Sequence, residues 1–111
     1  MAEDKETEQN ISQLQLYEQS LQNMLIQKQQ FQSQITELES ALKELDSSND
    51  SYKIIGNIMV KTKKEDLKKD LESKKSTVQL RIKTMEKQEE NIKEKVKKLQ
   101  EEVMKKMQHK E

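Results

Sequence analysis

The sequence predicts an all-α protein, a long antiparallel two-helix coiled coil with one β-hairpin inserted between the helices. Three observations support this fold class. Apolar residues make up only 31% of the 111 residues, which is too few for an ordinary globular core but enough for a coiled coil, which needs two apolar positions in seven. These residues recur at heptad spacing in two long segments. A short β-branched run surrounds the only glycine, Gly56, between the two segments.

The first helix is expected over residues 8–46. Charged residues reach 38% of the chain, a proportion that is also typical of disorder, so the periodicity has to decide. Alternating steps of three and four residues select ten positions, which we call the seam of this helix, and nine of them are apolar. They are Leu14, Tyr17, Leu21, Met24, Lys28, Phe31, Ile35, Leu38, Leu42 and Leu45. So regular a pattern indicates a coiled-coil helix and argues against disorder.

The second helix is expected over residues 63–107. Nine of the eleven positions in its seam are apolar. These positions are Leu67, Leu71, Lys74, Val78, Ile82, Met85, Glu89, Ile92, Val96, Leu99 and Val103. Two successive steps of four residues surround Val78, which is a stutter. We expect this stutter to relax the supercoil locally.

The two seams match when the chain folds back on itself. Residues whose numbers sum to about 113 are then paired, as in Phe31 with Ile82. Opposite net charges, −7 for residues 1–50 and +7 for residues 51–111, favour this pairing. The polar seam residues Lys28 and Glu89 fall in adjacent layers. They either form a contact that fixes the register or extend separately into solvent, and the sequence leaves both possibilities open.

The segment between the helices has the chemistry of a β-hairpin. Residues 46–50 form a turn-forming run that ends the first helix. Two β-branched segments, 52–55 and 58–61, flank Gly56-Asn57, which predicts a two-residue type II′ turn. Thr62 and Glu65 have the spacing of a capping box at the start of the second helix.

This hairpin predicts an oligomer. Alternation along the strands places apolar side chains on both faces, with Ile55, Ile58 and Val60 on one and Tyr52, Ile54 and Met59 on the other. A two-stranded sheet is marginal in water, and one with two apolar faces is less stable still. Because the coiled coil offers no sheet, we expect the six residues to form an interface with the hairpins of other subunits.

The helix–hairpin–helix order and the hairpin sequence Tyr52–Lys61 resemble the beta class of prefoldin subunits, whose members carry a single hairpin. The resemblance covers residues 10–107, although Asn57 replaces the proline or other residue that many relatives have. It implies a single domain of residues 1–111, with the hairpin at about 51–61. It also implies a hexamer of two alpha and four beta subunits, in which the hairpins form β-barrels. Such subunits hold unfolded client proteins without ATP and deliver them to a group II chaperonin. The short lysine-rich form looks archaeal.

Candidate client-binding residues are the apolar side chains that lie off the seam, in the half away from the hairpin. They are Leu16, Leu25, Ile26, Met104 and Met107. Their clustering favours a contact surface, and methionine adapts readily to varied partners. The alternative is that they are scattered surface residues. In that case the chain would be a structural coiled-coil spacer with no client.

No enzymatic activity and no cofactor are expected. The chain has no cysteine, and its single histidine, His109, cannot form a metal site alone. There is no phosphate-binding glycine loop and no Ser/His/Asp constellation. The lysines of the second helix alternate with acids and lack aromatic neighbours, which argues against nucleic-acid binding. An N-terminus without an apolar run predicts no membrane span and a cytoplasmic protein.

Overall fold

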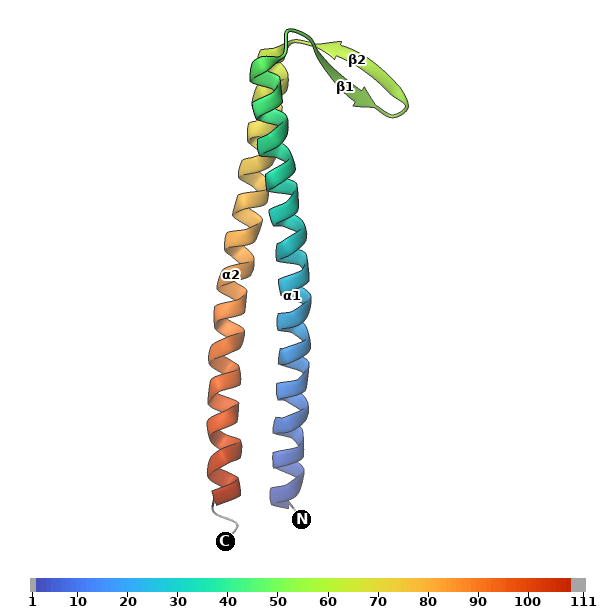
Figure 1. The fold of residues 1–111 in the computed structure, drawn as a ribbon. Coiled ribbons are helices and arrows are strands. Elements are labelled where there is room, and N and C mark those ends of the chain that lie inside the picture. Colours follow the sequence, from blue (N-terminus) through green and yellow to red (C-terminus); the bar gives the residue numbers. More distant parts are fainter. Residues whose placement is uncertain (1, 109–111) are drawn as a thin grey trace. The chain divides into compact units, whose positions relative to one another are not determined.

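The computed structural model describes the backbone of residues 2–108 and the side chains of residues 5–108. The elements follow in the order α1 (Ala2–Ser47), β1 (Ser51–Ile55), β2 (Ile58–Thr62) and α2 (Lys64–Gln108) (Figure 1). Two long helices and a single hairpin confirm the predicted fold class. Both helices lie close to their predicted spans of 8–46 and 63–107, except that α1 begins six residues earlier. Neither helix contains glycine or proline, so no residue interrupts its backbone hydrogen bonds.

Burial along α1 follows the predicted seam. From Leu14 to Leu45, all ten seam positions are at least partly buried. Ser20, beside Leu21, is the one other residue of this stretch that is not exposed. The apolar stripe of this helix is therefore narrow, as expected for a two-stranded coiled coil.

The seam of α2 differs from the prediction at one position. Lys74 is exposed, whereas Lys75 is partly buried and takes the place in the seam. The two successive steps of four therefore join Leu67, Leu71 and Lys75, and they do not surround Val78. The Lys75 ammonium lies 3.3 Å from a carboxylate oxygen of Glu39 on α1. The long lysine stem can cover apolar surface while its charged end reaches this carboxylate, which explains how lysine is accommodated here.

The contacts of the chain divide it into two compact units. The hairpin unit comprises Gln29–Lys83, and the terminal unit comprises Met1–Lys28 and Thr84–Glu111. In the hairpin unit, Ile35, Val78 and Ile82 form a buried cluster against which Phe31 packs. Ile35 with Val78 and Phe31 with Ile82 each sum to 113. This cluster therefore has the predicted antiparallel register.

The terminal unit is also antiparallel. An early residue of α1, Glu6, lies 2.7 Å from Lys106 near the end of α2, measured between Oε1 and Nζ. Further along α1, Lys28 pairs with Glu89, which precedes Lys106 on α2. Met85, whose number sums to 113 with that of Lys28, is buried. The order of these contacts requires the helix segments to run in opposite directions.

The hairpin turn is of the predicted type. Gly56 and Asn57 are the two residues between the paired Ile55 and Ile58. Gly56 has a φ of +62°, and Asn57 has a negative φ. A positive φ at the first central residue alone is the pattern of a type II′ turn, which matches the twist of the flanking strands.

The predicted capping box at the start of α2 is wrong. Thr62 is the last residue of β2 and pairs with Ser51. Its hydroxyl oxygen is buried and has no hydrogen-bond partner. The Lys63 carbonyl accepts the first helical hydrogen bond, from the Leu67 amide at 3.1 Å, so that Lys63 occupies the N-cap position. Thr62 therefore belongs to strand β2 and does not cap α2.

Candidate functional site

The hairpin carries two apolar faces. β1 and β2 pair antiparallel, with Ile55 opposite Ile58 and Ile54 opposite Met59. Opposite residues of paired strands share a side of the sheet, and successive residues alternate between sides. The register therefore places Ile55, Ile58 and Val60 on one face and Tyr52, Ile54 and Met59 on the other.

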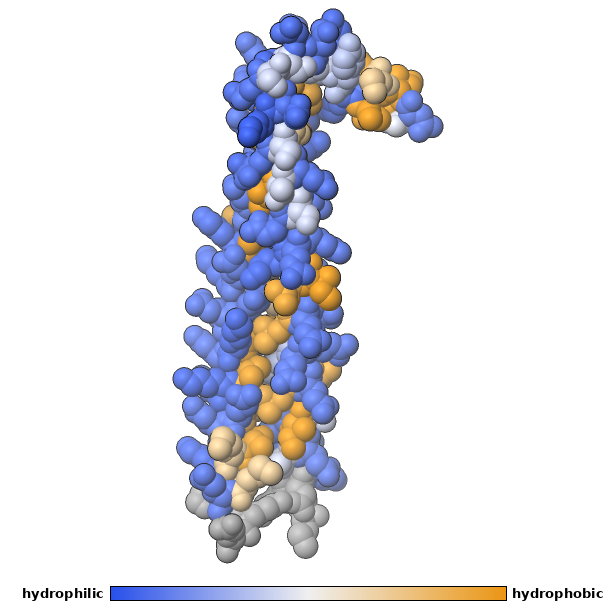
Figure 2. Space-filling view, viewed as in Figure 1, coloured by the Kyte–Doolittle hydropathy of each residue, from blue (hydrophilic) through white to orange (hydrophobic). Residues whose placement is uncertain are grey.

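These six side chains are exposed to solvent in the single chain. Their exposed fractions range from 40% for Val60 to 69% for Ile54. Figure 2 shows the hairpin as a largely apolar projection, coloured orange. Contiguous apolar surface of this kind is uncommon on a monomeric protein and marks an interaction site.

The strand edges add a second feature of an interaction site. The sheet has only two strands, in the order β1-β2. Each strand therefore has one edge that no other strand of the described residues covers. The backbone amides and carbonyls along such an edge are a template for pairing with another strand.

Polar contacts fix the base of the hairpin. Ser51 is buried, and its hydroxyl donates a hydrogen bond of 2.7 Å to the Thr62 carbonyl. The Lys53 ammonium lies 3.6 Å from Oδ2 of Asp70 on α2. Lys74 approaches the same oxygen at 3.5 Å. Oδ2 of Asp70 has no contact with hydrogen-bond geometry, and its lysine contacts at these distances are loose ion pairs.

The five candidate client-binding residues lie in the terminal unit, and all are exposed. Their exposed fractions run from 49% for Leu25 to 63% for Met107. Ile11, which was not among the predicted residues, is 41% exposed in the same unit. The sequence held the signal, because continuing the alternation of three- and four-residue steps back from Leu14 selects residue 10 and leaves the apolar Ile11 off the seam.

The five residues do not form one continuous patch. Successive residues of an α-helix are about 100° apart around its axis, because one turn takes 3.6 residues. Leu25 flanks the seam of α1, Ile26 points away from it, and Leu16 lies towards the other flank. On α2, Met104 and Met107 are three residues apart and therefore lie about 60° apart, as neighbours on one side of the helix. The terminal unit therefore presents separate apolar groups among polar side chains.

The polar layer of the terminal unit is an ion pair. The Lys28 ammonium lies 3.0 Å from Oε1 of Glu89. The Lys28 side chain is 26% exposed and the Glu89 side chain 12%. The same Glu89 oxygen has no contact that meets hydrogen-bond angles. We treat the interaction as a close ion pair because the separation is short. The sequence left open whether Lys28 and Glu89 contact each other or extend separately into solvent. In the structure they contact each other.

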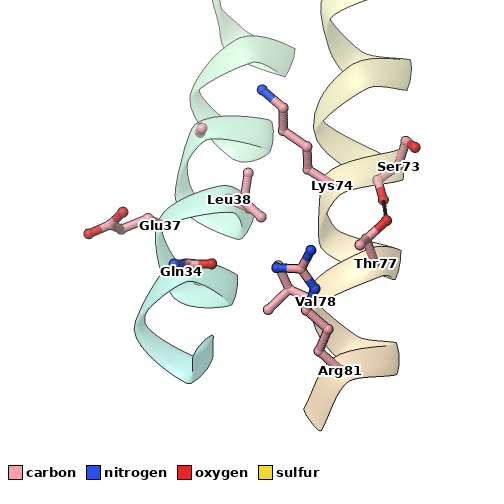
Figure 3. Close-up of a pocket in the computed structure, with 9 residues that line it drawn as sticks. Gln34, Glu37, Leu38, Ser73, Lys74, Thr77, Val78 and Arg81 are labelled. Atoms are coloured by element: carbon pink, nitrogen blue, oxygen red, sulfur yellow. Dashed lines mark hydrogen bonds between the residues drawn. The ribbon is translucent and has the colours of Figure 1, made fainter. Parts of the chain in front are cut away.

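In the hairpin unit, a groove opens between α1 and α2 (Figure 3). Its volume is about 540 Å³. Leu38 and Val78 extend into it, and Lys74 and Arg81 border it. The Thr77 hydroxyl donates to the Ser73 carbonyl at 3.1 Å, as the dashed line shows. The lining residues include no histidine, cysteine or paired acid and base that could activate a nucleophile.

Within the residues that the structure describes, no three His, Cys, Asp or Glu side chains are placed to hold a metal ion. His109 lies outside those residues. No helix in the described part of the chain is both long and apolar enough to cross a membrane.

Comparison with known proteins gives consistent matches. The family model described as "Prefoldin subunit" matches residues 8–110. Prefoldin subunit beta of Archaeoglobus fulgidus is 44% identical over 87 residues, which are 76% of this chain and 75% of the relative. Prefoldin subunit beta of Pyrococcus furiosus is 37% identical over 92 residues, which are 80% and 79%. The crystal structure of the prefoldin beta subunit from Thermococcus strain KS-1 has a TM-score of 0.84 and 33% identity, and the match covers 90% of each chain.

Proposed function

This chain belongs to the prefoldin subunit family, a family of chaperone subunits, and we propose that it is a beta-type subunit that holds unfolded proteins without ATP. The observation that carries the proposal is the presence of two separate sets of exposed apolar side chains. One set lies on the hairpin, where an assembly contact is expected. The other lies in the terminal unit, where the described residues leave it exposed to solvent.

The hairpin is the proposed assembly contact. Its six apolar residues pack against the hairpins of neighbouring subunits, and its free edges pair with their strands. The partner chains are a prefoldin alpha subunit and further copies of this chain, in a hexamer of two alpha and four beta subunits. Closing several hairpins into a β-barrel would remove all free edges, which is how β-structures avoid uncontrolled pairing.

The magnitudes favour a closed arrangement over a simple pair. Fully burying a large apolar side chain contributes about 1.5–3 kcal/mol. Since the six side chains are already partly covered, one hairpin can contribute on the order of 5–10 kcal/mol. Association costs about 4–15 kcal/mol in lost freedom of motion. Burying only one face would contribute too little free energy to offset the cost of association. A barrel buries more of the hairpin and contributes more.

The terminal unit is the proposed client contact. Leu16, Leu25, Ile26, Met104 and Met107 offer apolar surface to the apolar segments that an unfolded chain exposes. Single side chains give weak binding, and several subunits acting on one client add avidity. Weak and divided contacts also allow release without ATP. The client is then passed to a group II chaperonin.

The test is suppression of aggregation by the assembled complex. Chemically denatured malate dehydrogenase is diluted into buffer with and without the complex, and light scattering is followed. We expect suppression without ATP. Changing Leu25, Ile26 and Met104 to Ser together should weaken suppression while native mass and helix content stay unchanged. A complex that assembles but never suppresses aggregation would support the structural spacer instead.

A further inference from the structure

Residues 9–27 of α1, in the terminal unit, are almost free of charge, although the turns before them are charged. Between Gln9 and Gln27 the only charged residue is Glu18, in a chain of which 38% is charged. The remaining polar residues of this segment are glutamine, asparagine, serine and tyrosine. Lys28 follows directly, but its charge is paired with Glu89 and largely covered. The outer surface of this helix segment therefore presents amides and hydroxyls in place of ions.

The facing segment of α2 has the opposite character. Between Thr84 and Gln108 more than half of the residues are Lys or Glu. Met104 and Met107 stand directly beside Lys105 and Lys106. A client segment that lies on this surface must displace water from charged groups or avoid them. Removing water from an ion costs far more than removing it from an amide.

From this contrast we propose that the client contact of the terminal unit lies on α1, on the uncharged surface of residues 9–27, and that it selects extended segments that are apolar and poor in charge. This inference rests on the proposed function and narrows the contact to one helix, which leaves Met104 and Met107 of α2 outside it. We call this surface the amide face. Its exposed apolar residues are Ile11, Leu16, Leu25 and Ile26.

The amides suit such a client. Gln13, Gln15, Gln19 and Gln22 are exposed. A glutamine side chain has both donor and acceptor groups, so it can pair with the backbone carbonyls and amides of an extended chain whatever its sequence. Leu16, with Gln9, Ser12 and Gln13, lines a shallow hollow on the surface of α1, which the charged Lys5 and Glu8 also line, outside the amide face. An apolar client side chain can enter such a hollow while its backbone meets the neighbouring amides.

Complementarity of charge identifies the occupant. A surface with one exposed ion has no attraction for the phosphates of a nucleic acid, which bind through cations. An acidic or basic peptide would lose the water around its own charges and gain no counter-ion. An uncharged apolar segment has no charge to dehydrate and needs no counter-ion. Burial of its side chains therefore favours binding. Such segments come from the interiors of folded proteins and are exposed when these proteins unfold.

The test adds charge to α1 and removes it from α2. In the assembled full-length complex, Gln15→Lys and Gln22→Lys are combined in one variant, and Gln15→Glu and Gln22→Glu in another. Both substitutions keep a residue of similar helix propensity. The matched control combines Lys95→Gln and Lys97→Gln at exposed positions of α2. Helix content and native mass are measured for every variant.

We expect either α1 variant to need about tenfold more complex for half-maximal suppression of malate dehydrogenase aggregation, which corresponds to about 1.4 kcal/mol. The α2 control should hold the client as the unsubstituted complex does. A photo-crosslinking residue at Gln19 should capture the client, and one at Lys97 should not. Unchanged holding in both α1 variants, or equal loss in the α2 control, would overturn the amide face while leaving the proposed function intact. Absence of holding by the unsubstituted complex would instead remove the proposed function and this inference together.

Discussion

Lys28 on α1 and Glu89 on α2 form an ion pair of 3.0 Å inside a mostly apolar seam. Both side chains are mostly covered, and the Glu89 carboxylate is the better covered of the two. A charged layer of this kind stabilises less than an apolar one, because both ions lose water. It does penalise every alternative register, since a shift would leave each charge facing apolar side chains. The pair thus selects the antiparallel register at some cost in stability.

The first prediction concerns this pair. Glu89→Gln should lower the free energy of unfolding by about 1–3 kcal/mol, a range between those of exposed and fully buried pairs. Glu39→Gln is the matched control, because it breaks the more exposed pair with Lys75 and should cost less than about 1 kcal/mol. Replacing both Lys28 and Glu89 by Leu should restore or exceed the original stability. Urea unfolding followed by circular dichroism measures all three, and equal losses at Glu89 and Glu39 would contradict the special role of the layer.

The fold-back of the terminal unit can be tested by crosslinking. Leu21 and Ile92 are partly buried seam residues whose numbers sum to 113. Since the chain has no cysteine of its own, Leu21→Cys with Ile92→Cys introduces the only thiols. We expect a disulfide within one chain, seen as faster migration in non-reducing electrophoresis. A parallel dimer would give links between chains, including in the Leu21→Cys single variant.

A third prediction separates assembly from folding. Ile54→Asp or Ile58→Asp would bury a charge in the proposed contact between hairpins, which is costly without a partner. Native mass should therefore fall to that of a smaller species, while helix content measured by circular dichroism changes little. Leu80→Asp is the control, because Leu80 is 65% exposed on α2 outside the hairpin and the substitution should leave the mass unchanged. Full-size complexes of the hairpin variants would place the joint elsewhere.

The turn itself supplies a fourth prediction. Gly56 has a φ of +62°, and a Cβ placed there would meet no atom within 4 Å. The cost of Gly56→Ala is therefore conformational, about 1–2 kcal/mol for a non-glycine residue in the left-handed region. Asn57→Ala, at a negative φ, should cost much less. The comparison is made by the urea concentration at which the native complex dissociates, and a larger effect at Asn57 would contradict the turn type.

A fifth prediction tests the start of α2. Lys63 occupies the N-cap position without a side-chain acceptor for the exposed amides of the first turn. Lys63→Asp should raise stability by about 1 kcal/mol, because a carboxylate at this position accepts a hydrogen bond from the helix backbone. Thr62→Ala should have a smaller effect than the loss of a cap, since the Thr62 hydroxyl has no partner. Thermal unfolding of the two variants decides between Lys63 and Thr62 as the cap.

Local sequence patterns determined most of the architecture. Heptad spacing without proline or helical glycine predicts two long helices, because the pattern can be followed within each segment, and packing of the two seams stabilises them. The Gly56-Asn57 pair specified the turn, because only glycine accepts its φ without strain. Turn length then fixed the register and the two faces of the hairpin. The low charge of residues 9–27 was likewise visible in the sequence.

Where a residue had two possible positions or contacts, only the tertiary structure determined which one it takes. Either Lys74 or Lys75 can occupy the seam with a shift of one residue in the heptad pattern. Packing against α1 placed Lys75 there. Thr62 could serve a cap or a strand, and pairing with Ser51 assigned it to the strand. Lys28 and Glu89 could reach each other or the solvent, and their ion pair forms because the fold brings two segments distant in sequence to 3.0 Å. In each case the outcome depends on energies between elements, which local patterns do not contain.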